Sequence, residues 1–590
     1  MEASSEERKT STEQGEEPPK RRKGGLITMP FIIANESFEK VASYGLLPNM
    51  ISYLMKDYRM SVAKGTNLIF FWSAATNFMP LVGAFLADSF LGRFLTIALG
   101  SLSSLLGMIV LWLTTMIPHA KPPPCNSLTG NCKSPTAAQY AVLVLAFVLM
   151  SIGAGGVRPC SQAFGADQVD RRDNPKRERV LETFFNWYYA TSCFSVLIAL
   201  TVIVYIQDHL GWRVGFGVPA ILMLLSALIF LMASPLYIRM KPRKSLLTSF
   251  AQVAVAACRN RGLAAVPRDS NVQYHHAKDS TITTPSNKLR FLNKACIIRD
   301  PEQDIGLHES AKNPWRLCTV EEVEELKVLI KVIPIWSSGI MMSINTSQSS
   351  FQLLQAKSMN RHLASKFQIP AGSFGMFTII TIVLWIPLYD RVFIPLASRL
   401  RGKPARIGVK VRMGLGLFCS FMAMVISGTV ENIRRRRAIL EGHYDDGQSV
   451  VDMSALWLVP QYCLHGFAEA FNAIGQTEFY YSEFPKSMSS IATSLFGLGM
   501  AVANLLASIV LSTVDNITSR GGKESWVSSN INKGRYDYYY WLLAVLSFGN
   551  LLYYLACSWA YGPCAEPRNK INDERNGFEV EDESRSGKEG

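Results

Sequence analysis

The segment "ANESFEKVASYG", Ala34 to Gly45, places two acids and a base inside an apolar stretch that runs from Leu26 to Met55. On a helix, Glu36 and Lys40 are four residues apart and Glu39 is three residues from Glu36, so all three lie near one face. An ionised side chain at membrane depth costs at least ~2.5 kcal/mol unless it is paired or wetted. We therefore expect the three side chains to face a polar cavity. The alternative, a solvated helix end, is disfavoured by the apolar residues on both sides.

The composition is that of a polytopic membrane protein. Of the 590 residues, 48% are hydrophobic and 18% are charged, and long apolar runs recur along the chain. The formal net charge of +14 does not indicate nucleic-acid binding, because the basic residues form short clusters beside apolar runs. The lipid bilayer is the expected partner, and nothing in the sequence sets an oligomeric state.

Twelve apolar segments are long enough to span a membrane as helices, and they fall into two groups of six. The first group covers residues 27–55, 65–87, 94–117, 138–163, 182–206 and 214–237, and the second covers 327–351, 371–396, 408–430, 454–479, 487–513 and 537–561. The predicted organisation is a disordered tail, a six-helix half, a linker, a second six-helix half and a second disordered tail, at residues 1–26, 27–237, 238–326, 327–561 and 562–590.

The linker is basic and too long to be a simple turn, so we expect most of it to be disordered. Within it, residues 245–261, "SLLTSFAQVAVAACRNR", are amphipathic and are expected to lie along the membrane surface.

Basic clusters predict the orientation. They occur in the N-terminal tail, after the fourth span, in the linker and after the eighth span. If the chain has twelve spans, all four lie on the same side of the membrane. The positive-inside rule therefore predicts that both termini and the linker are cytoplasmic, most simply at the plasma membrane. One cluster disagrees: "IRRRR", residues 433–437, follows the ninth span and would face outward.

The outward loops contain two candidate modification sites. Cys125 and Cys132 could form a disulfide, and Asn516 in "NIT" could carry a glycan, whereas the sequons at Asn35 and Asn345 fall inside spans. The cysteines form no CxxC pair, and the sequence predicts neither a metal site nor a cofactor.

A further intramembrane charge, Arg158, lies in "SIGAGGVRPCSQAFGADQ". The glycines allow close helix packing, and Pro159 frees backbone groups, as in the broken helices that line transporter cavities. Arg158 is therefore a candidate counter-ion for Glu36 or Glu39, and equally for an anionic substrate.

Polar residues also mark two spans of the second half. Glu478 is a polar residue in an apolar span and is expected to line the wall of a cavity. Glu469 could either line a cavity or pack against another helix. A neutral stripe that includes Thr346 and Gln348 fits substrate contact and helix-to-helix hydrogen bonding equally well.

The sequence resembles a known family. "GAFLADSFLGRF", with Gly83, Asp88, Gly92 and Arg93, is similar to the loop of the major facilitator superfamily between spans 2 and 3. "ESFEK" resembles the E-x-x-E-[RK] motif of proton-coupled oligopeptide transporters, and "GGVRPCSQAFGADQ" resembles their span-4 segment. The chain is similar to the plant nitrate transporter 1/peptide transporter family, near its first subfamily. The resemblance implies an all-α, twelve-span major facilitator fold whose two six-helix halves are joined by a long cytoplasmic loop.

This resemblance implies residue roles. It assigns Glu36, Glu39, Lys40 and Arg158 to proton coupling. This chain has Lys40 where the family usually has Arg, and Arg158 where the family usually has Lys. It also implies that Glu478 and Tyr44 line the pocket.

Two charged pairs are expected to act as cytoplasmic gates. They are Asp88 with Arg93 and Asp390 with Arg391. Thr96, in "RFLT", has the basic-minus-three pattern that many kinases read, so it is a possible regulatory phosphorylation site. The alternative is an ordinary threonine at a helix start.

We expect a proton-coupled symporter of a small anion, with nitrate as the first choice. The alternatives are hormone anions such as gibberellin or jasmonate, and dipeptides. A membrane nutrient sensor that does not transport is the alternative from another class. An enzyme is not indicated, because the sequence shows no nucleophile with a base and no metal cluster.

Overall fold

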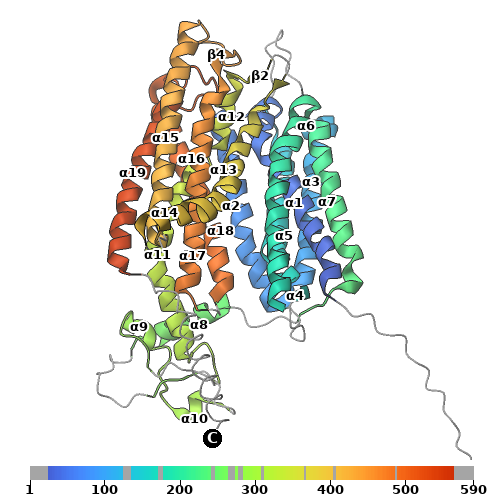
Figure 1. Ribbon diagram of the computed structural model, residues 1–590. Coiled ribbons are helices and arrows are strands. Elements are labelled where there is room, and N and C mark those ends of the chain that lie inside the picture. Colours follow the sequence, from blue (N-terminus) through green and yellow to red (C-terminus); the bar gives the residue numbers. More distant parts are fainter. Residues whose placement is uncertain are drawn as a thin grey trace, which may run out of the picture.

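The computed structural model describes residues 24–123, 134–169, 177–240, 246–262, 273–276, 284–306, 311–364, 367–402, 407–485 and 488–563. Long helices form two bundles that stand side by side (Figure 1). Cys125, Cys132 and most of both predicted tails lie outside the described residues.

The first half is built from α1 to α7. Its elements are η1 Leu26–Thr28, α1 Met29–Lys56, α2 Val62–Leu86, η2 Ala87–Leu91, α3 Arg93–Met116, α4 Ala137–Val169, α5 Arg177–Ile198, η4 Ala199–Ile203, α6 Val204–His209 and α7 Gly211–Met232. The turn η4 is π-helical and joins α5 to α6, so these three elements form one span.

The second half is built from α11 to α19. Its helical elements are α11 Val320–Thr346, α12 Ser349–Lys357, η7 Ala371–Gly375, α13 Met376–Leu388, η8 Tyr389–Phe393, α14 Ile394–Arg401, α15 Val409–Leu440, η9 Ala455–Leu458, α16 Val459–Ala468, η10 Glu469–Ala473, α17 Ile474–Glu483, α18 Ser489–Thr518 and α19 Tyr536–Tyr561. Four short strands accompany them: β1 Met359–Asn360 pairs in parallel with β4 Val451–Ser454, and β2 His362–Ala364 pairs with β3 Phe367–Gln368 as a hairpin.

Each predicted span coincides with a helical segment. In the described part of the chain, ten of these segments are long and apolar enough to cross a membrane. The other two are α1 and the continuous helix α16–η10–α17. Both carry acidic residues, which lower their hydropathy. Together they complete the predicted set of twelve.

Close packing in the first half depends on small residues. A Cβ atom added to Gly83 of α2 would lie 1.8 Å from the carbonyl oxygen of Gly155 in α4. Likewise, a Cβ atom on Gly100 of α3 would lie 2.8 Å from the Cα of Gly156. The glycine run in α4 therefore lets three helices approach at backbone distance, just before the turn that carries Arg158.

The described parts of the linker are folded, so the prediction of a mostly disordered segment is wrong for them. The amphipathic helix α8 (Leu246–Arg259) packs with α9 (Arg290–Asn293) and the start of α11. The shared cluster includes Val253, Ala256, Leu292 and Val323. The apolar face of α8 is therefore buried against protein rather than laid on the bilayer. The apolar residues of α8, α9 and the start of α11 together form a small core that none of these segments could form alone.

The helix α11 begins earlier than predicted, at Val320. Thr319 and Glu322 form a capping box: the Glu322 amide donates to the Thr319 hydroxyl over 3.3 Å, and the Thr319 amide donates to the Glu322 carboxylate over 3.1 Å. This cap fixes the junction between the linker and the membrane helix.

The two ends of the molecule differ. The linker elements α8, α9 and α10 (Pro301–Asp304) lie at one end, here called the linker end, and β2 and β4 lie at the other, here called the hairpin end (Figure 1).

At the hairpin end, the unexpected basic cluster of α15 makes structural contacts. Arg434 and Glu431 are both fully buried, with contacts of 2.7 and 2.9 Å between the guanidinium and the carboxylate. Arg434 also donates to Asn532 over 2.8 Å. Arg435 and Arg437 donate to the backbone carbonyls of Gly534 and Asp452. Three of the four arginines thus contact neighbouring segments of the hairpin end, so the basic run has a structural role there.

Candidate functional site

The charged face of α1 is buried inside the first half. The Lys40 ammonium lies 3.3 Å from Glu36, and the Arg158 Nε lies 3.8 Å from Glu39. The Ser43 hydroxyl donates to the same Glu39 oxygen over 2.7 Å. The structure thus brings together the four charges that the sequence predicts, as two neighbouring pairs along α1.

Each carboxylate keeps one oxygen free. Oε2 of Glu36 and Oε2 of Glu39 are buried and have no hydrogen-bond partner within the described part of the chain. A carboxyl group with one free oxygen can accept a proton there without losing its existing contact. Both glutamates therefore have the geometry for reversible protonation.

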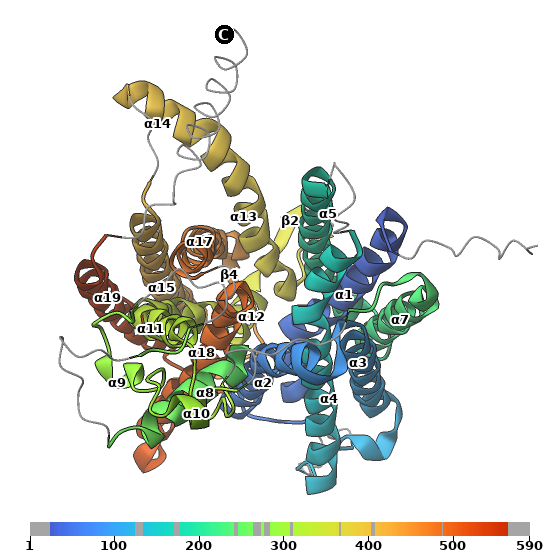
Figure 2. The same cartoon turned by 90° about the horizontal axis from the view of Figure 1, so that it is seen from below.

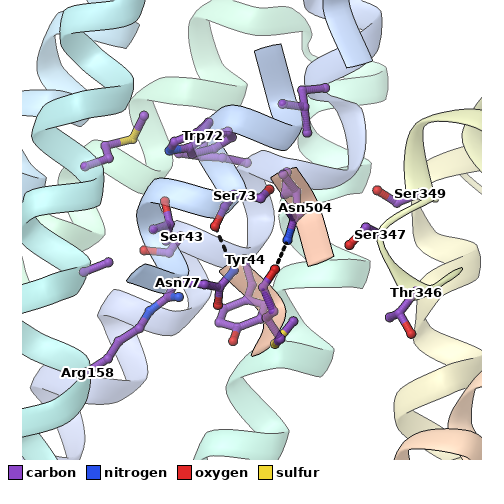
Figure 3. Close-up of a pocket in the computed structure, with 17 residues that line it drawn as sticks. Ser43, Tyr44, Trp72, Ser73, Asn77, Arg158, Thr346, Ser347, Ser349 and Asn504 are labelled. Atoms are coloured by element: carbon purple, nitrogen blue, oxygen red, sulfur yellow. Dashed lines mark hydrogen bonds between the residues drawn. The ribbon is translucent and has the colours of Figure 1, made fainter. Parts of the chain in front are cut away.

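A cavity of about 230 Å³ lies beside this cluster, between the two halves (Figure 3). Its polar lining comes from α1, α2 and α4 on one side and from the second half on the other. These residues are Ser43, Tyr44, Ser73, Thr76, Asn77 and Arg158 from the first half, and Thr346, Ser347, Ser349 and Asn504 from the second. We call this space the central cavity.

Arg158 alone is charged among the described residues that line the central cavity. Its guanidinium carbon lies 5.3 Å from the centre of the Tyr44 ring, within range of a cation–π interaction. The figure shows the side chain extending from α4 toward Tyr44 (Figure 3). Arg158 is therefore shared between the buried carboxylate Glu39 and the cavity.

Three further predicted pocket residues have different positions. Thr346 lines the central cavity. Gln348 does not: it is fully buried, donates to the Ile344 carbonyl over 2.8 Å and accepts from the Tyr539 hydroxyl over 3.2 Å. Glu478 is half-exposed and lies 2.6 Å from Arg412, away from the cavity lining. Gln348 therefore has the helix-packing position that the sequence left open.

Glu469 begins the π-helical turn η10 and is partly buried. It is not among the residues that line the central cavity, and no described residue forms a hydrogen bond or an ion pair with it.

The first predicted gate has a third member. Arg93 lies 3.7 Å from Asp88 and 2.6 Å from Asp167, near the end of α4. Asp167 lies in the "GADQ" segment, and its role was not predicted, although an acid at the end of the helix that carries Arg158 was the available signal. By contrast, Asp390 and Arg391 are exposed, and neither forms an ion pair with a described residue.

Thr96 and Asn516 differ in accessibility. The Thr96 hydroxyl is buried and donates to the Gly92 carbonyl over 3.0 Å, so a kinase would need the start of α3 to open locally. Asn516 is exposed in the last turn of α18, at the hairpin end.

Contacts that close the hairpin end were missed by the sequence analysis. Lys357 of α12 donates to the Ser52 hydroxyl of α1 over 2.6 Å, and Arg361 lies 3.7 Å from Asp208. A Cβ atom added to Gly372 would lie 2.9 Å from Asn49 Oδ1. Each contact joins one half to the other, so the halves meet tightly at this end.

Comparison with known proteins places the chain in a family. Residues 94–527 match the model of the POT family, PTR2. The chain is 65% identical over 570 residues to Protein NRT1/ PTR FAMILY 1.2 of Arabidopsis thaliana, covering 96% of this chain and 94% of that protein. It is 63% identical over 568 residues to Protein NRT1/ PTR FAMILY 1.1 of the same plant, covering 96% of each chain.

Solved structures show the same fold at low sequence identity. An auto-inhibited POT family peptide transporter is similar with a TM-score of 0.66 at 20% identity, covering 92% of this chain and 99% of that chain. The POT family transporter PepTSo is similar with a TM-score of 0.65 at 18% identity, covering 91% and 98%. The predicted family and the predicted all-α, twelve-span fold are confirmed. The chain belongs to the POT family, in its NRT1/PTR branch, and is a proton-coupled membrane transporter rather than an enzyme.

Proposed function

We propose that the protein is a symporter of protons with a small monovalent anion, and that nitrate is its substrate. The observation that carries this proposal is the single charge of the central cavity: Arg158 is the only charged residue among its described lining residues. One guanidinium surrounded by hydroxyl and amide groups suits one negative charge, and its planar fork suits a planar anion.

The same lining argues against a dipeptide. A zwitterionic peptide carries an ammonium group, which binds best to a carboxylate, and the described lining residues of the cavity include no acid. The carboxylates Glu36 and Glu39 are buried beside the cavity and already face Lys40 and Arg158.

Proton coupling follows from competition for Arg158. Protonation of Glu39 removes the negative charge that faces Arg158, which frees the guanidinium to bind an anion. Loss of the proton restores the ion pair and weakens anion binding. Glu36 and Lys40 form a second pair on the same face of α1, so they set the local charge against which Glu39 titrates.

We propose that the linker end is cytoplasmic and the hairpin end is outside, at the plasma membrane. The basic clusters found in the sequence, including those of the linker itself, support this orientation. With the hairpin end closed by Lys357, Arg361 and Gly372, the anion would leave toward the linker end. If two protons accompany each monovalent anion, one net positive charge enters per cycle and gains about 2.3 kcal/mol per 100 mV of inside-negative potential.

Uptake into proteoliposomes tests the proposal. The purified protein is reconstituted, and accumulation of labelled nitrate, a dipeptide and gibberellin is compared at two external pH values with the same internal pH. We expect nitrate to accumulate only with an inward proton gradient. Accumulation of gibberellin or of the dipeptide in place of nitrate would overturn the substrate assignment. Nitrate binding without any accumulation would instead favour a sensor.

A further inference from the structure

A second, apolar groove of about 800 Å³ lies between the two halves near the hairpin end. One wall comes from η4 and α6 of the first half, and the other walls come from the β2–β3 hairpin, η7, α13 and the start of α16. The lining residues are Thr201, Val202, Tyr205, Leu363, Phe367, Ile369, Pro370, Ser373, Met376, Phe377, Leu456 and Val459. Seen along the bundle, α5 and α13 flank β2 at the margin of the molecule (Figure 2).

The inner part of the groove lies at the depth of lipid chains. Thr201 precedes His209, the last residue of its span, by eight residues, or about 12 Å along a helix, and the hydrocarbon core of a bilayer is about 30 Å thick. Met376 and Phe377 start the long apolar helix α13 on the opposite wall. The Thr201 hydroxyl donates to the Leu197 carbonyl over 2.8 Å, so this polar group makes its hydrogen bond within its own helix.

Only a few kinds of molecule or chain segment can occupy the groove. About half of the residues in segments 1–23 and 564–590 are charged, so neither terminal segment suits an apolar groove at this depth. Val202, on the wall formed by the first half, is 50% exposed, and within the hydrocarbon only lipid or a second membrane protein can cover such an apolar surface.

We propose that this groove binds one acyl chain of a bilayer lipid, from the leaflet at the hairpin end. A flexible chain can fill a groove between two bodies that must move relative to each other. A second copy docked across the same joint would lock them together. The bound class is therefore a lipid hydrocarbon chain, with no head-group selectivity implied.

The acyl chain can bind only one conformation of the transporter, the one in which the hairpin end is closed. Both walls of the groove meet only while the hairpin end is closed, since the Gly372 backbone packs against Val204 beside the lining residues; an added Cβ atom would lie 3.0 Å from Val204 Cγ1. A ligand that binds one conformer shifts the equilibrium toward it. Lipid in the groove therefore stabilises the closed hairpin end.

Photolabelling tests the proposal. The full-length protein is placed in lipid nanodiscs that contain a phospholipid with a photoreactive diazirine in the middle of one acyl chain, and the labelled peptides are mapped. We expect strong labelling of residues 201–205, 363–364, 367–377 and 456–459. Thr201→Trp and, from the opposite wall, Met376→Trp should reduce labelling of these segments to the level of the remaining lipid-facing surface. The matched control is Ile221→Trp on α7, an exposed site (52%) outside the groove, and it should leave the pattern unchanged.

Two outcomes would overturn the proposal. One is even labelling of all lipid-facing helices that neither groove variant changes. The other is a Val202→Cys variant that cross-links two copies in intact membranes while Ile221→Cys does not, because a second copy would then occupy the groove.

Discussion

Arg158 approaches Glu39 through its Nε atom at 3.8 Å, with the glutamate side chain fully buried and the arginine side chain 23% exposed. This distance is too long for a hydrogen bond, so the pair is held by charge alone. The guanidinium can therefore turn toward the cavity without breaking a directional bond. We expect the two side chains to separate and re-form in each transport cycle.

Glu39→Gln is expected to abolish proton-driven accumulation while retaining some downhill exchange. The neutral amide imitates the protonated glutamate and cannot cycle between two charge states. The measurement is nitrate accumulation in proteoliposomes with and without a pH gradient, beside counterflow at equal pH. Wild-type accumulation that still follows the pH gradient in this variant would exclude Glu39 from proton coupling.

Arg158→Lys should keep pH-driven transport with a weaker apparent affinity for the anion, by on the order of 1–2 kcal/mol if one charge-assisted hydrogen bond is lost. Lysine keeps the charge that faces Glu39, but it cannot present a fork to a planar anion. Arg158→Ala should remove uptake, since it leaves Glu39 and the anion without a cation. The dependence of uptake on nitrate concentration measures both, and uptake by Arg158→Ala at the wild-type rate would disprove the proposed site.

Gly372→Leu is expected to prevent closure of the hairpin end and stop net uptake. An added Cβ atom at Gly372 would lie 2.9 Å from Asn49 Oδ1 and 3.0 Å from Val204 Cγ1, whereas one at Gly375, the matched control position, would lie 3.8 Å from Leu200. A Ser52→Cys reporter, buried in the closed form, should react with a polar thiol reagent in the Gly372→Leu background and stay protected in the control. Equal protection in both backgrounds would contradict the prediction.

Glu431→Gln and Arg434→Met should each destabilise the protein by about 3–5 kcal/mol, because each leaves a buried charge without its partner. The double change Glu431→Leu with Arg434→Met should recover most of the loss. Arg436→Met, at an exposed position of the same helix, should stay within about 0.5 kcal/mol. Thermal unfolding in detergent is the readout, and single variants as stable as the double variant would show that the pair is not coupled.

Thr96→Asp is expected to slow transport, while Thr96→Ala stays close to the wild-type rate. A carboxylate at this buried position would lie in the turn where Arg93 contacts Asp88 and Asp167, and its charge would have no solvent. Initial uptake rates provide the test. If both variants transport with the wild-type affinity and rate, a phosphorylation switch at Thr96 is ruled out.

Much of the fold was predictable because lipid imposes a strong constraint. Every helix that crosses the bilayer needs about twenty apolar residues, so all twelve spans could be found. Most bounds were close, but α11 begins at Val320 rather than 327 and α15 ends at Leu440 rather than 430. The charges of α1 and Arg158 could be found for the same reason: an ion inside an apolar span is rare and needs a partner.

The contacts that could not be predicted share a different cause. Gln348 and Glu478 are polar residues in apolar helices, and their role depends on which neighbour each one faces. Tyr539 and Arg412, the residues that they contact, are 191 and 66 positions away along the chain. The closure between Lys357 and Ser52 joins residues 305 positions apart. No local pattern encodes such contacts, because they arise only when helices far apart in the sequence pack together. The folded linker was missed because its core is assembled from three separate short segments.

The buried pair in α15 has a consequence for biosynthesis. If the hairpin end is outside, the run of four arginines must be carried across the bilayer as the ninth span inserts. Glu431 and Arg434 are three residues apart, so they can neutralise each other inside one helical turn before any later helix has been synthesised. Asn532, which completes the cluster, is 98 residues further along the chain and emerges only near the end of translation. The order of synthesis therefore makes completion of this cluster a late event: until Asn532 has been synthesised, the Arg434 guanidinium lacks one of its hydrogen-bond partners.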